Sequence, residues 1–144
     1  MSTIRHLLKD RETFTVESHQ SVLEVARFMV ERNIGAVPVL DRGKLVGIFS
    51  ERDIMKRVVS EARDPATTRV REVMTRNPTV VGPAQDLHHC MLLMKQHGFR
   101  HLPISDGKQL LGLVSLRDIL LRDLDEKDDE VRFMRAYLHS GGAE

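Results

Sequence analysis

The stretch Gly112-Leu-Val-Ser115-Leu-Arg-Asp118 indicates the fold, because a near copy, Gly47-Ile-Phe-Ser50-Glu-Arg-Asp53, lies upstream. Each copy ends an apolar strand that contains a glycine and places a serine where a helix should begin. Glycine, serine and aspartate recur at one separation, since 118 − 53 = 65 and 112 − 47 = 65. The chain is therefore a tandem repeat, and an account of its function must explain both copies.

A helix and a hairpin precede this motif in each copy. The first helix should begin at Ser21, and its apolar stripe recurs at the same separation; the stripe residues are Val22, Val25, Ala26, Met29 and Val30, then Leu87, Cys90, Met91 and Met94. Hairpins follow, with turns at 41–44 and 106–107. Pro38 cannot donate to a sheet ladder, so its strand should have an edge or a break there. Gly35 ends the first helix and suits a backbone conformation that other residues resist.

Shorter segments complete the two halves. Residues 3–10 are expected to form a short docked helix, and 13–16 a brief strand. A second helix begins at Ser50 and carries four apolar residues, Ile54, Met55, Val58 and Val59. The last helix of the second copy runs into a solvated acidic patch at 125–130. We then expect a separate final helix at 131–138, packed on its own chain, and a flexible end.

These elements predict an α+β fold of two β-α-β-β-α halves with pseudo-twofold symmetry, which face each other and bury apolar surface that neither could hide alone. The predicted organisation has five parts: an N-terminal helical segment at 1–12, a first repeat at 13–60, a linker at 61–76, a second repeat at 77–124, and a C-terminal helix and tail at 125–144.

Composition excludes several classes of function. The 144 residues suffice for one domain with a buried core, and the formal net charge of +1, with both signs spread along the chain, gives no indication of nucleic-acid binding. A single cysteine excludes an intramolecular disulfide and favours the cytoplasm. No apolar run approaches the ~20 residues that span a membrane, and no signal core is present, so we expect no membrane partner.

Further pieces of sequence recur around the motif. The second half has Val81-x-Pro83-x-x-x-Leu87, Met94 and Gly98-Phe-Arg-His-Leu-Pro103-Ile-x-Asp106; the first has Val16-x-Ser18-x-x-x-Val22, Met29 and Gly35-Ala-Val-Pro38-Val-x-Asp41. In these features both halves resemble CBS domains, named after cystathionine β-synthase, which occur in tandem pairs called Bateman modules. The segment Glu72-Val-Met-Thr-Arg-Asn-Pro78 is similar to the family's entry to a second repeat. The resemblance covers roughly residues 5–124.

The resemblance implies a non-enzymatic regulatory module that senses an adenine nucleotide in the cleft between the repeats. AMP, ADP and ATP are typical ligands of such modules, with NAD-like or S-adenosyl ligands in some members, and no catalytic cofactor is implied. Such modules usually pair into flat, disc-shaped homodimers. The alternative is a protein-interaction module with degenerate nucleotide sites, which docks a partner enzyme or transporter.

Residue by residue, the resemblance places ribose at the repeated aspartates and the ribose or phosphate edge at the repeated serines; these are Asp53, Asp118, Ser50 and Ser115. A carboxylate has two acceptor oxygens, which suit a ribose diol, and a helix N-terminus favours phosphate. Ser-x-x-Asp is also a helix capping box, and capping would be preferred for one isolated copy. Arg52 and Arg117 recur beside it although capping does not require them, so ligand binding is the better interpretation of the pair.

The two halves differ before the proline, where the second has Arg100-His101 and the first has Ala36-Val37. Arginine is a fixed-charge phosphate donor and histidine a pH-sensitive one. We therefore hypothesise that the Asp118 site binds a phosphorylated adenosine more tightly than the Asp53 site. Apolar strand residues such as Val37 would enclose the adenine. In related modules the adenine wall comes from the opening strand of the other repeat, which implies Phe14, Thr15 and Val16 for the Asp118 site and Pro78, Thr79 and Val80 for the Asp53 site.

Other chemistry is less well supported. His88 and His89 lie beside Cys90, but neighbouring helical residues point in different directions, so we interpret them as surface residues. Cys90 falls on the buried stripe and is interpreted as a core thiol. The sequence shows no glycine-rich phosphate loop, catalytic triad or pair of carboxylates, and we expect no enzymatic activity and no metal.

Overall fold

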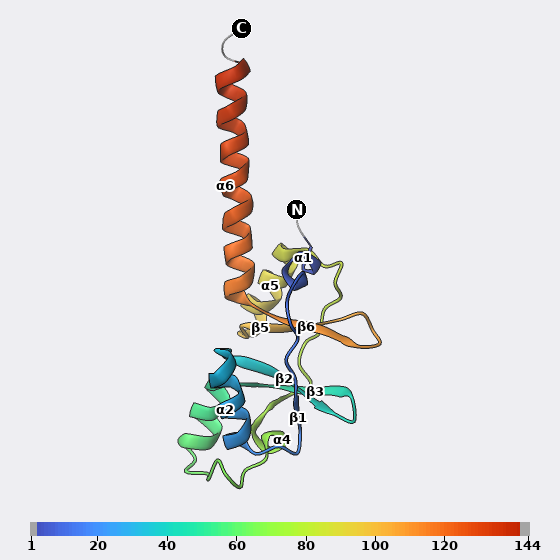
Figure 1. Ribbon diagram of the computed structural model, residues 1–144, viewed down its shortest axis with the longest axis vertical. Coiled ribbons are helices and arrows are strands. Elements are labelled where there is room, and N and C mark those ends of the chain that lie inside the picture. Colours follow the sequence, from blue (N-terminus) through green and yellow to red (C-terminus); the bar gives the residue numbers. More distant parts are fainter. Residues whose placement is uncertain (1–2, 142–144) are drawn as a thin grey trace.

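The computed structural model describes residues 3–141, with side chains from Thr3 to His139. The elements follow in chain order (Figure 1): α1 (Arg5–Leu8), β1 (Val16–Glu17), α2 (Val22–Arg32), β2 (Ala36–Asp41), β3 (Lys44–Ser50), α3 (Glu51–Asp53), the π-helix η1 (Ile54–Val59), α4 (Val70–Val73), β4 (Thr75–Arg76), α5 (Leu87–His97), β5 (His101–Ser105), β6 (Leu110–Ser115) and α6 (Leu116–Gly141). The fold is mixed α+β, as the sequence predicted.

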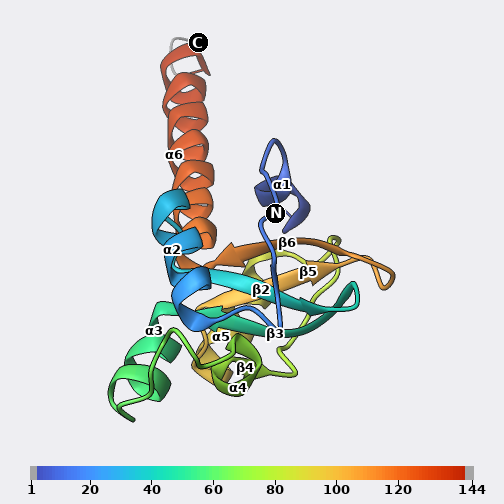
Figure 2. The same ribbon diagram turned by 60° about the horizontal axis from the view of Figure 1, so that its bottom comes forward.

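Each repeat is built on one antiparallel hairpin. In the first, β2 and β3 form the centre of a sheet of order β1-β2-β3-β4, and β1 joins β2 in parallel. In the second, β5 pairs with β6, and Val81 makes a parallel bridge to Ile104. The motif glycines and serines are equivalent in register, because Ala36 pairs with Ser50 as His101 pairs with Ser115. Figure 2 shows the two hairpins lying one above the other.

Each repeat has its own hydrophobic core. The first core contains eleven buried residues, among them Val25, Val37 and Phe49; the second contains nine, among them Cys90 and Leu102. The two central helices supply the predicted stripes, with one exception. Val30 is 80% exposed, because eight residues after Val22 a helix has turned ~80° beyond two full turns.

Pro38 lies where the sheet has a local edge. The short strand β1 pairs only with Val39 and Leu40 of β2, while Pro38 pairs with Ile48 on the other side. The predicted break in the ladder is therefore confirmed on the side of β1. The predicted strand at 13–16 is wrong over most of its length, since β1 begins at Val16.

The left-handed backbone position after α2 is Asn33, with φ of 53°, rather than Gly35 as expected. Asparagine tolerates this conformation, and its N–H caps the helix by bonding to Met29 O and Val30 O. Gly35 serves a different purpose, because a Cβ there would lie 3.1 Å from an oxygen of Glu51.

The second helix of the first repeat changes type after one turn. Glu51–Asp53 is α-helical and Ile54–Val59 is a π-helix, which the sequence did not predict. The wider π-helical turn alters which side chains face inward. Val58 is buried and Ile54 partly buried, but Met55 is 60% exposed and Val59 68% exposed.

The segment expected to be a polar linker is tied to the first repeat at its end. Val70 and Val73 of α4 lie in the first core, and Thr68 O accepts a hydrogen bond from Val22 N at 2.9 Å. The segment therefore carries part of the core as well as the connection to the second repeat.

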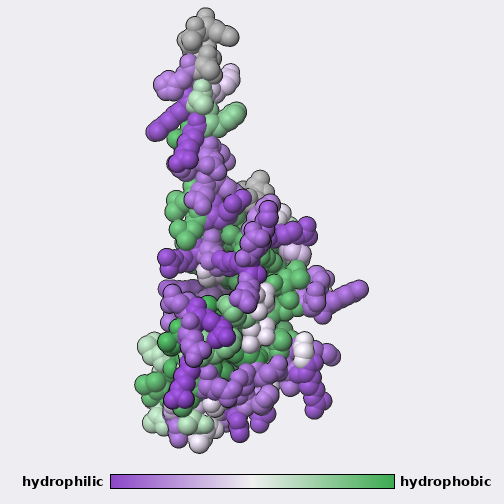
Figure 3. Space-filling model, in the orientation of Figure 1, coloured by the Kyte–Doolittle hydropathy of each residue, from purple (hydrophilic) through white to green (hydrophobic). Residues whose placement is uncertain are grey.

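The C-terminal helix is continuous, contrary to the predicted separate helix at 131–138. No proline or glycine interrupts 116–140, and ion pairs one turn apart, such as Lys127 to Asp123 at 3.0 Å, stabilise the acidic stretch. Its distal part extends away from both repeats (Figures 1 and 3). Val131, Phe133, Met134 and Leu138 are exposed, so the expected packing on the chain's own core is wrong. The flexible end predicted from Ser140 is wrong for its first two residues, because α6 continues to Gly141; residues 142–144 lie outside the described part.

Candidate nucleotide clefts

The two copies of the motif line two separate clefts. The Asp118 cleft has a volume of about 700 Å³ and is lined by the segment before β1, the turn between α2 and β2, and the start of α6. The Asp53 cleft has a volume of about 950 Å³ and is lined by α3, η1, the segment 75–79 and the turn between α5 and β5. His101 and Gly35 line both clefts, so the two sites share one wall.

In the Asp118 cleft the serine and aspartate form a reciprocal cap at the start of α6. Ser115 N donates to Asp118 Oδ2 at 2.8 Å, and Asp118 N donates to Ser115 Oγ at 3.0 Å. The capping interpretation of the motif is thus satisfied, and the cap also holds the carboxylate at the mouth of the cleft. The same cap forms between Ser50 and Asp53 at the start of α3.

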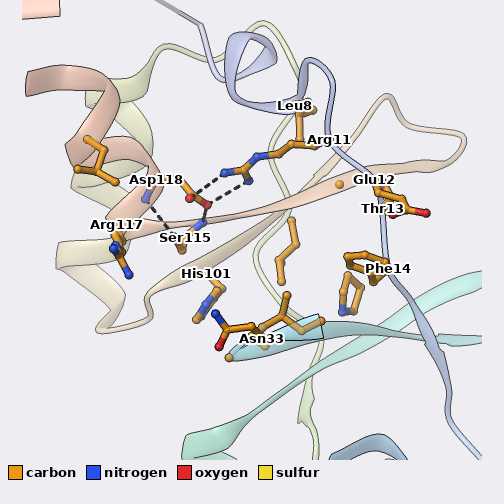
Figure 4. A pocket seen from close by; sticks show the side chains of 17 residues that line it. Leu8, Arg11, Glu12, Thr13, Phe14, Asn33, His101, Ser115, Arg117 and Asp118 are labelled. Carbon is orange, nitrogen blue, oxygen red and sulfur yellow. Dashed lines mark hydrogen bonds and ion pairs between the residues drawn. The ribbon is translucent and has the colours of Figure 1, made fainter. Parts of the chain in front are cut away.

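Arg11 covers the Asp118 carboxylate. Its Nη1 donates to Asp118 Oδ2 at 3.1 Å and its Nη2 lies 2.8 Å from Oδ1, so both acceptor oxygens are engaged (Figure 4). Burial raises the pKa of Asp118, but the hydrogen bonds from Arg11 and Ser115 and the charge of Arg11 outweigh it, and the pKa lies below its ordinary value. The carboxylate is therefore ionised at neutral pH, and a ribose diol would have to share it with Arg11 or displace Arg11.

Phe14 provides an apolar wall in the Asp118 cleft, as predicted from the resemblance (Figure 4). Its ring meets Phe28 edge to face with centroids 6.0 Å apart, and the Arg32 guanidinium lies 3.7 Å from the Phe28 centroid. These contacts fix the ring of Phe14 at the cleft. Thr15 and Val16 do not line this cleft, and Val16 is part of the first core.

His101 is partly buried between the clefts. Burial lowers its pKa and outweighs the opposing influence of Asp118 and Glu51, while Arg100 lowers it further. The neutral imidazole therefore predominates at neutral pH, where it can both donate and accept a hydrogen bond.

The Asp53 carboxylate is more enclosed than Asp118, with only 7% of the residue exposed. Ser50 N and Oγ donate to Oδ2 at 3.0 and 3.2 Å, and Thr75 Oγ1 donates to Oδ1 at 3.2 Å. Arg57 Nε lies 3.9 Å from Oδ1. Internal partners thus use much of the capacity of this carboxylate.

The structure places Arg100 in the Asp53 cleft rather than in the Asp118 cleft, where the sequence hypothesis put it. Register explains the difference. Pro103 matches Pro38 at the 65-residue separation, so Arg100 is equivalent to Gly35 and His101 to Ala36. Arg100 precedes β5 by one residue and faces the other repeat. Arg100, the expected phosphate donor of the Asp118 site, therefore lines the Asp53 cleft.

The other predicted residues divide between the clefts and the core. Arg117 lines the Asp118 cleft; Arg52, Pro78 and Thr79 line the Asp53 cleft. Two expected wall residues lie elsewhere. Val37 is fully buried in the first core, because it is equivalent to the core residue Leu102, and Val80 lines neither cleft.

Sequence reasoning missed several side chains that the fold brings to the clefts. They are Arg11, Lys56, Arg57, Thr75 and Arg76. Arg57 lies one turn after Asp53, a spacing that could have indicated its proximity. Arg11 gave no such signal, because 107 residues separate it from Asp118.

Fewer amide N–H groups at the starts of α3 and α6 are free to bind a phosphate than the sequence suggested. Glu51 N donates to Gly35 O at 3.0 Å, and Leu116 N donates to Arg100 O at 2.8 Å. Because the serine oxygens already accept from the third amide of each helix, two of the first three amides are used within the chain. A bound phosphate would therefore depend mainly on side chains.

Comparison with known proteins agrees with this architecture. The family model of the CBS domain matches residues 4–60 and 70–125, once for each repeat. The chain belongs to the CBS domain family. The CBS domain-containing protein YhcV of Bacillus subtilis (strain 168) is 34% identical over 127 residues, which cover 88% of this chain and 89% of YhcV. The recognition of a CBS pair from the repeated motifs is thereby confirmed.

Solved structures extend this comparison to ligands. A protein with CBS domains from Burkholderia ambifaria MC40-6 is 37% identical, with a TM-score of 0.79, over 83% of this chain and 91% of that chain. The CBS domain pair of protein MJ0100, in complex with 5-methylthioadenosine and S-adenosyl-L-methionine, is 26% identical, with a TM-score of 0.75, over 88% and 98%. A CBS pair of this fold thus binds adenosyl compounds.

The histidines and the cysteine that the sequence offered for metal or thiol chemistry lie on α5. His88 and His89 are exposed, and residues 3–139 contain no group of three or more His, Cys, Asp or Glu side chains that could hold a metal ion. Burial raises the pKa of the Cys90 thiol to about 11, so the reactive thiolate is disfavoured. In the described part of the chain no helix is both long and apolar enough to cross a membrane.

Proposed function

We propose that this protein is a non-enzymatic regulatory module that binds an adenosyl ligand, AMP or a related nucleotide, in the clefts between its repeats. The single observation that carries the proposal is the repeated Ser-x-Arg-Asp cap, which presents an aspartate at each of two large clefts. The likeness to a CBS pair that binds methylthioadenosine and S-adenosyl-L-methionine supports it. A ligand regulates only if its affinity differs between two states of the protein.

The clefts offer the groups that an adenosine needs. Phe14 and neighbouring apolar residues such as Leu113 provide a surface for adenine in the Asp118 cleft, the Asp118 carboxylate accepts ribose hydroxyls, and His101 donates at neutral pH. Binding there requires Arg11 to leave at least one carboxylate oxygen. Arg11 lies in the segment between α1 and β1, and its side chain is 39% exposed, so it can leave the carboxylate without disturbing either core.

A cheap experiment tests the proposal. The protein has no tryptophan and one tyrosine, so a co-purified adenine nucleotide would dominate its ultraviolet absorption, and mass spectrometry of the heat-released ligand would identify it. Calorimetry with AMP, ATP and S-adenosylmethionine should detect binding to the stripped protein. Absence of binding by all adenosyl compounds would contradict the proposal, and turnover of a bound nucleotide would contradict its non-enzymatic part.

The second candidate is a protein-interaction module that docks a partner enzyme or transporter. It is favoured by the internal partners of both aspartates, because Arg11 engages Asp118 and Thr75 engages Asp53. If calorimetry detects no adenosyl ligand, this candidate becomes the better account.

A further inference from the structure

The two clefts differ most in charge. Among the described residues that line the Asp53 cleft, five are cationic, Arg52, Lys56, Arg57, Arg76 and Arg100, and two are acidic, Glu51 and Asp53. The Asp118 cleft has two of each, Arg11, Arg117, Glu12 and Asp118. With histidines counted as neutral, the formal charges are therefore +3 and 0. Since the whole chain carries only +1, the Asp53 cleft concentrates positive charge.

Main-chain carbonyls hold two of these cations in place. Arg57 Nη1 donates to Met74 O at 2.8 Å and to Val73 O at 3.3 Å, and Arg76 Nη2 donates to Arg71 O at 3.3 Å. A carbonyl fixes a guanidinium without cancelling its charge. The Asp53 carboxylate lies 3.9 Å from Arg57 Nε and accepts hydrogen bonds from Ser50 and Thr75. Much of the positive charge is therefore available to a ligand.

The cations approach the cleft from both repeats. Arg52 belongs to α3 and Lys56 to η1, both in the first repeat, whereas Arg100 reaches the cleft from the turn before β5. Arg52, Lys56 and Arg100 are exposed, so a ligand can reach them without unfolding either core. A phosphate chain that extended from a nucleoside in this cleft would meet side chains from two directions.

We propose that the Asp53 cleft is selective for a nucleoside di- or triphosphate, whereas the Asp118 cleft takes an adenosyl ligand of low charge. This inference rests on the proposed function, because it names the ligand class for one of the same clefts. Each added phosphate makes the nucleotide more negative. The five cations therefore make the binding free energy most favourable for the nucleotide with the most phosphates. A neutral cleft gives no such preference. The assignment reverses the asymmetry that the sequence alone suggested.

Calorimetry on the 144-residue chain freed of bound ligand, with AMP, ADP and ATP in EDTA buffer, tests this selectivity. ATP should bind at least ~10-fold more tightly than AMP, with ADP between them, and the difference should shrink as salt rises. In the double variant Lys56→Ala/Arg100→Ala the ATP-to-AMP ratio should fall to about 2 or less, because the phosphate-facing charge is removed. Both side chains are exposed, and thermal melts verify that the variant folds.

A matched control removes the same charge elsewhere. The double variant Arg27→Ala/Lys95→Ala neutralises two exposed cations that line neither cleft, and it should keep the wild-type ratio. Equal affinity for AMP and ATP in the wild type would overturn the inference and leave the proposed function standing. A ratio lost in Arg117→Ala but kept in Lys56→Ala/Arg100→Ala would also overturn it, since the phosphates would then lie in the Asp118 cleft. Failure of all three nucleotides and of S-adenosylmethionine to bind would remove the proposed function itself.

Discussion

The ion pair between Arg11 and Asp118 decides whether the Asp118 carboxylate is free to accept hydrogen bonds from a ligand. The guanidinium lies 2.8 Å from one carboxylate oxygen and 3.1 Å from the other, so the aspartate proposed to accept a ribose already has a partner within the chain. Both side chains are partly exposed, and such pairs contribute only about 0–1 kcal/mol. A ligand can therefore replace Arg11 at modest cost.

His101 makes stability depend on pH. Its folded pKa is lowered from 6.5, so the unfolded chain takes up a proton first as pH falls, and the free energy of unfolding decreases below about pH 6.5. We expect His101→Asn to flatten urea-unfolding stability between pH 7.5 and 5.5, by less than ~1.4 kcal/mol per pH unit, the limit for one proton. His89→Asn, at an exposed position, should retain the slope. An unchanged slope in His101→Asn would show that His101 is not the source of the pH dependence.

The two motif glycines, Gly47 and Gly112, occupy equivalent strand positions but pack against different elements. A Cβ at Gly47 would lie 2.6 Å from Met74 Sδ and 2.7 Å from Thr75 O, where β4 pairs with β3. At Gly112 the nearest atom is Leu8 Cδ2 at 2.6 Å, a side-chain tip of α1. Backbone cannot yield as a side chain can, so the first glycine is the stricter requirement.

We therefore expect unequal effects of the same substitution at the two glycines. Gly47→Ala should lower the free energy of unfolding by about 2–3 kcal/mol, because β4 must move away from β3. Gly112→Ala should cost less than ~1 kcal/mol, since Leu8 can change rotamer. Chemical denaturation followed by circular dichroism compares them. Equal losses would show that the contact of β3 with β4 is not the stricter one.

At the scale of the whole molecule, the chain crosses between its two cores before either repeat is complete. Ile4 of the N-terminal segment is fully buried in the second core, and the segment then runs past the Asp118 cleft to β1 in the first repeat. Arg11 and Phe14 lie on this crossing. The crossing segment links the two repeats beside the Asp118 cleft, so under the proposed function a ligand in that cleft would contact the connection between the halves.

The distal half of α6 lies outside the cooperative core, whereas its first turn is part of it. Ile119 is fully buried, so Ile119→Ala should cost about 3 kcal/mol. Leu138 is 65% exposed, so Leu138→Ala should change stability by no more than ~0.5 kcal/mol. Thermal and denaturant unfolding at two protein concentrations measure both. A large, concentration-dependent loss for Leu138→Ala would contradict the expectation and reveal a contact with another chain.

The repeat itself was accessible from sequence. Copies of the Ser-x-Arg-Asp motif at one separation predicted the tandem α+β fold, the hairpins and the capped helices, because local spacing and turn chemistry specify such elements. Burial was predicted less accurately for residues whose direction depends on the exact rotation of a helix. Val30 and Val59 fit an apolar stripe by spacing but are exposed, since ~80° of helical rotation turns Val30 outward and a π-helix turns Val59 outward.

Tertiary structure alone decided which charges meet. Arg11 and Asp118 are distant in sequence but form an ion pair. Arg100 lines the Asp53 cleft, and not the cleft of its own motif, because of its position in the strand register. The sequence determined that Gly112-Leu-Val-Ser115-Leu-Arg-Asp118 caps a helix beside a strand. Packing of one repeat on the other determined the charge of each cleft, because charges from distant segments act together only when the fold places them within a few ångströms of one site.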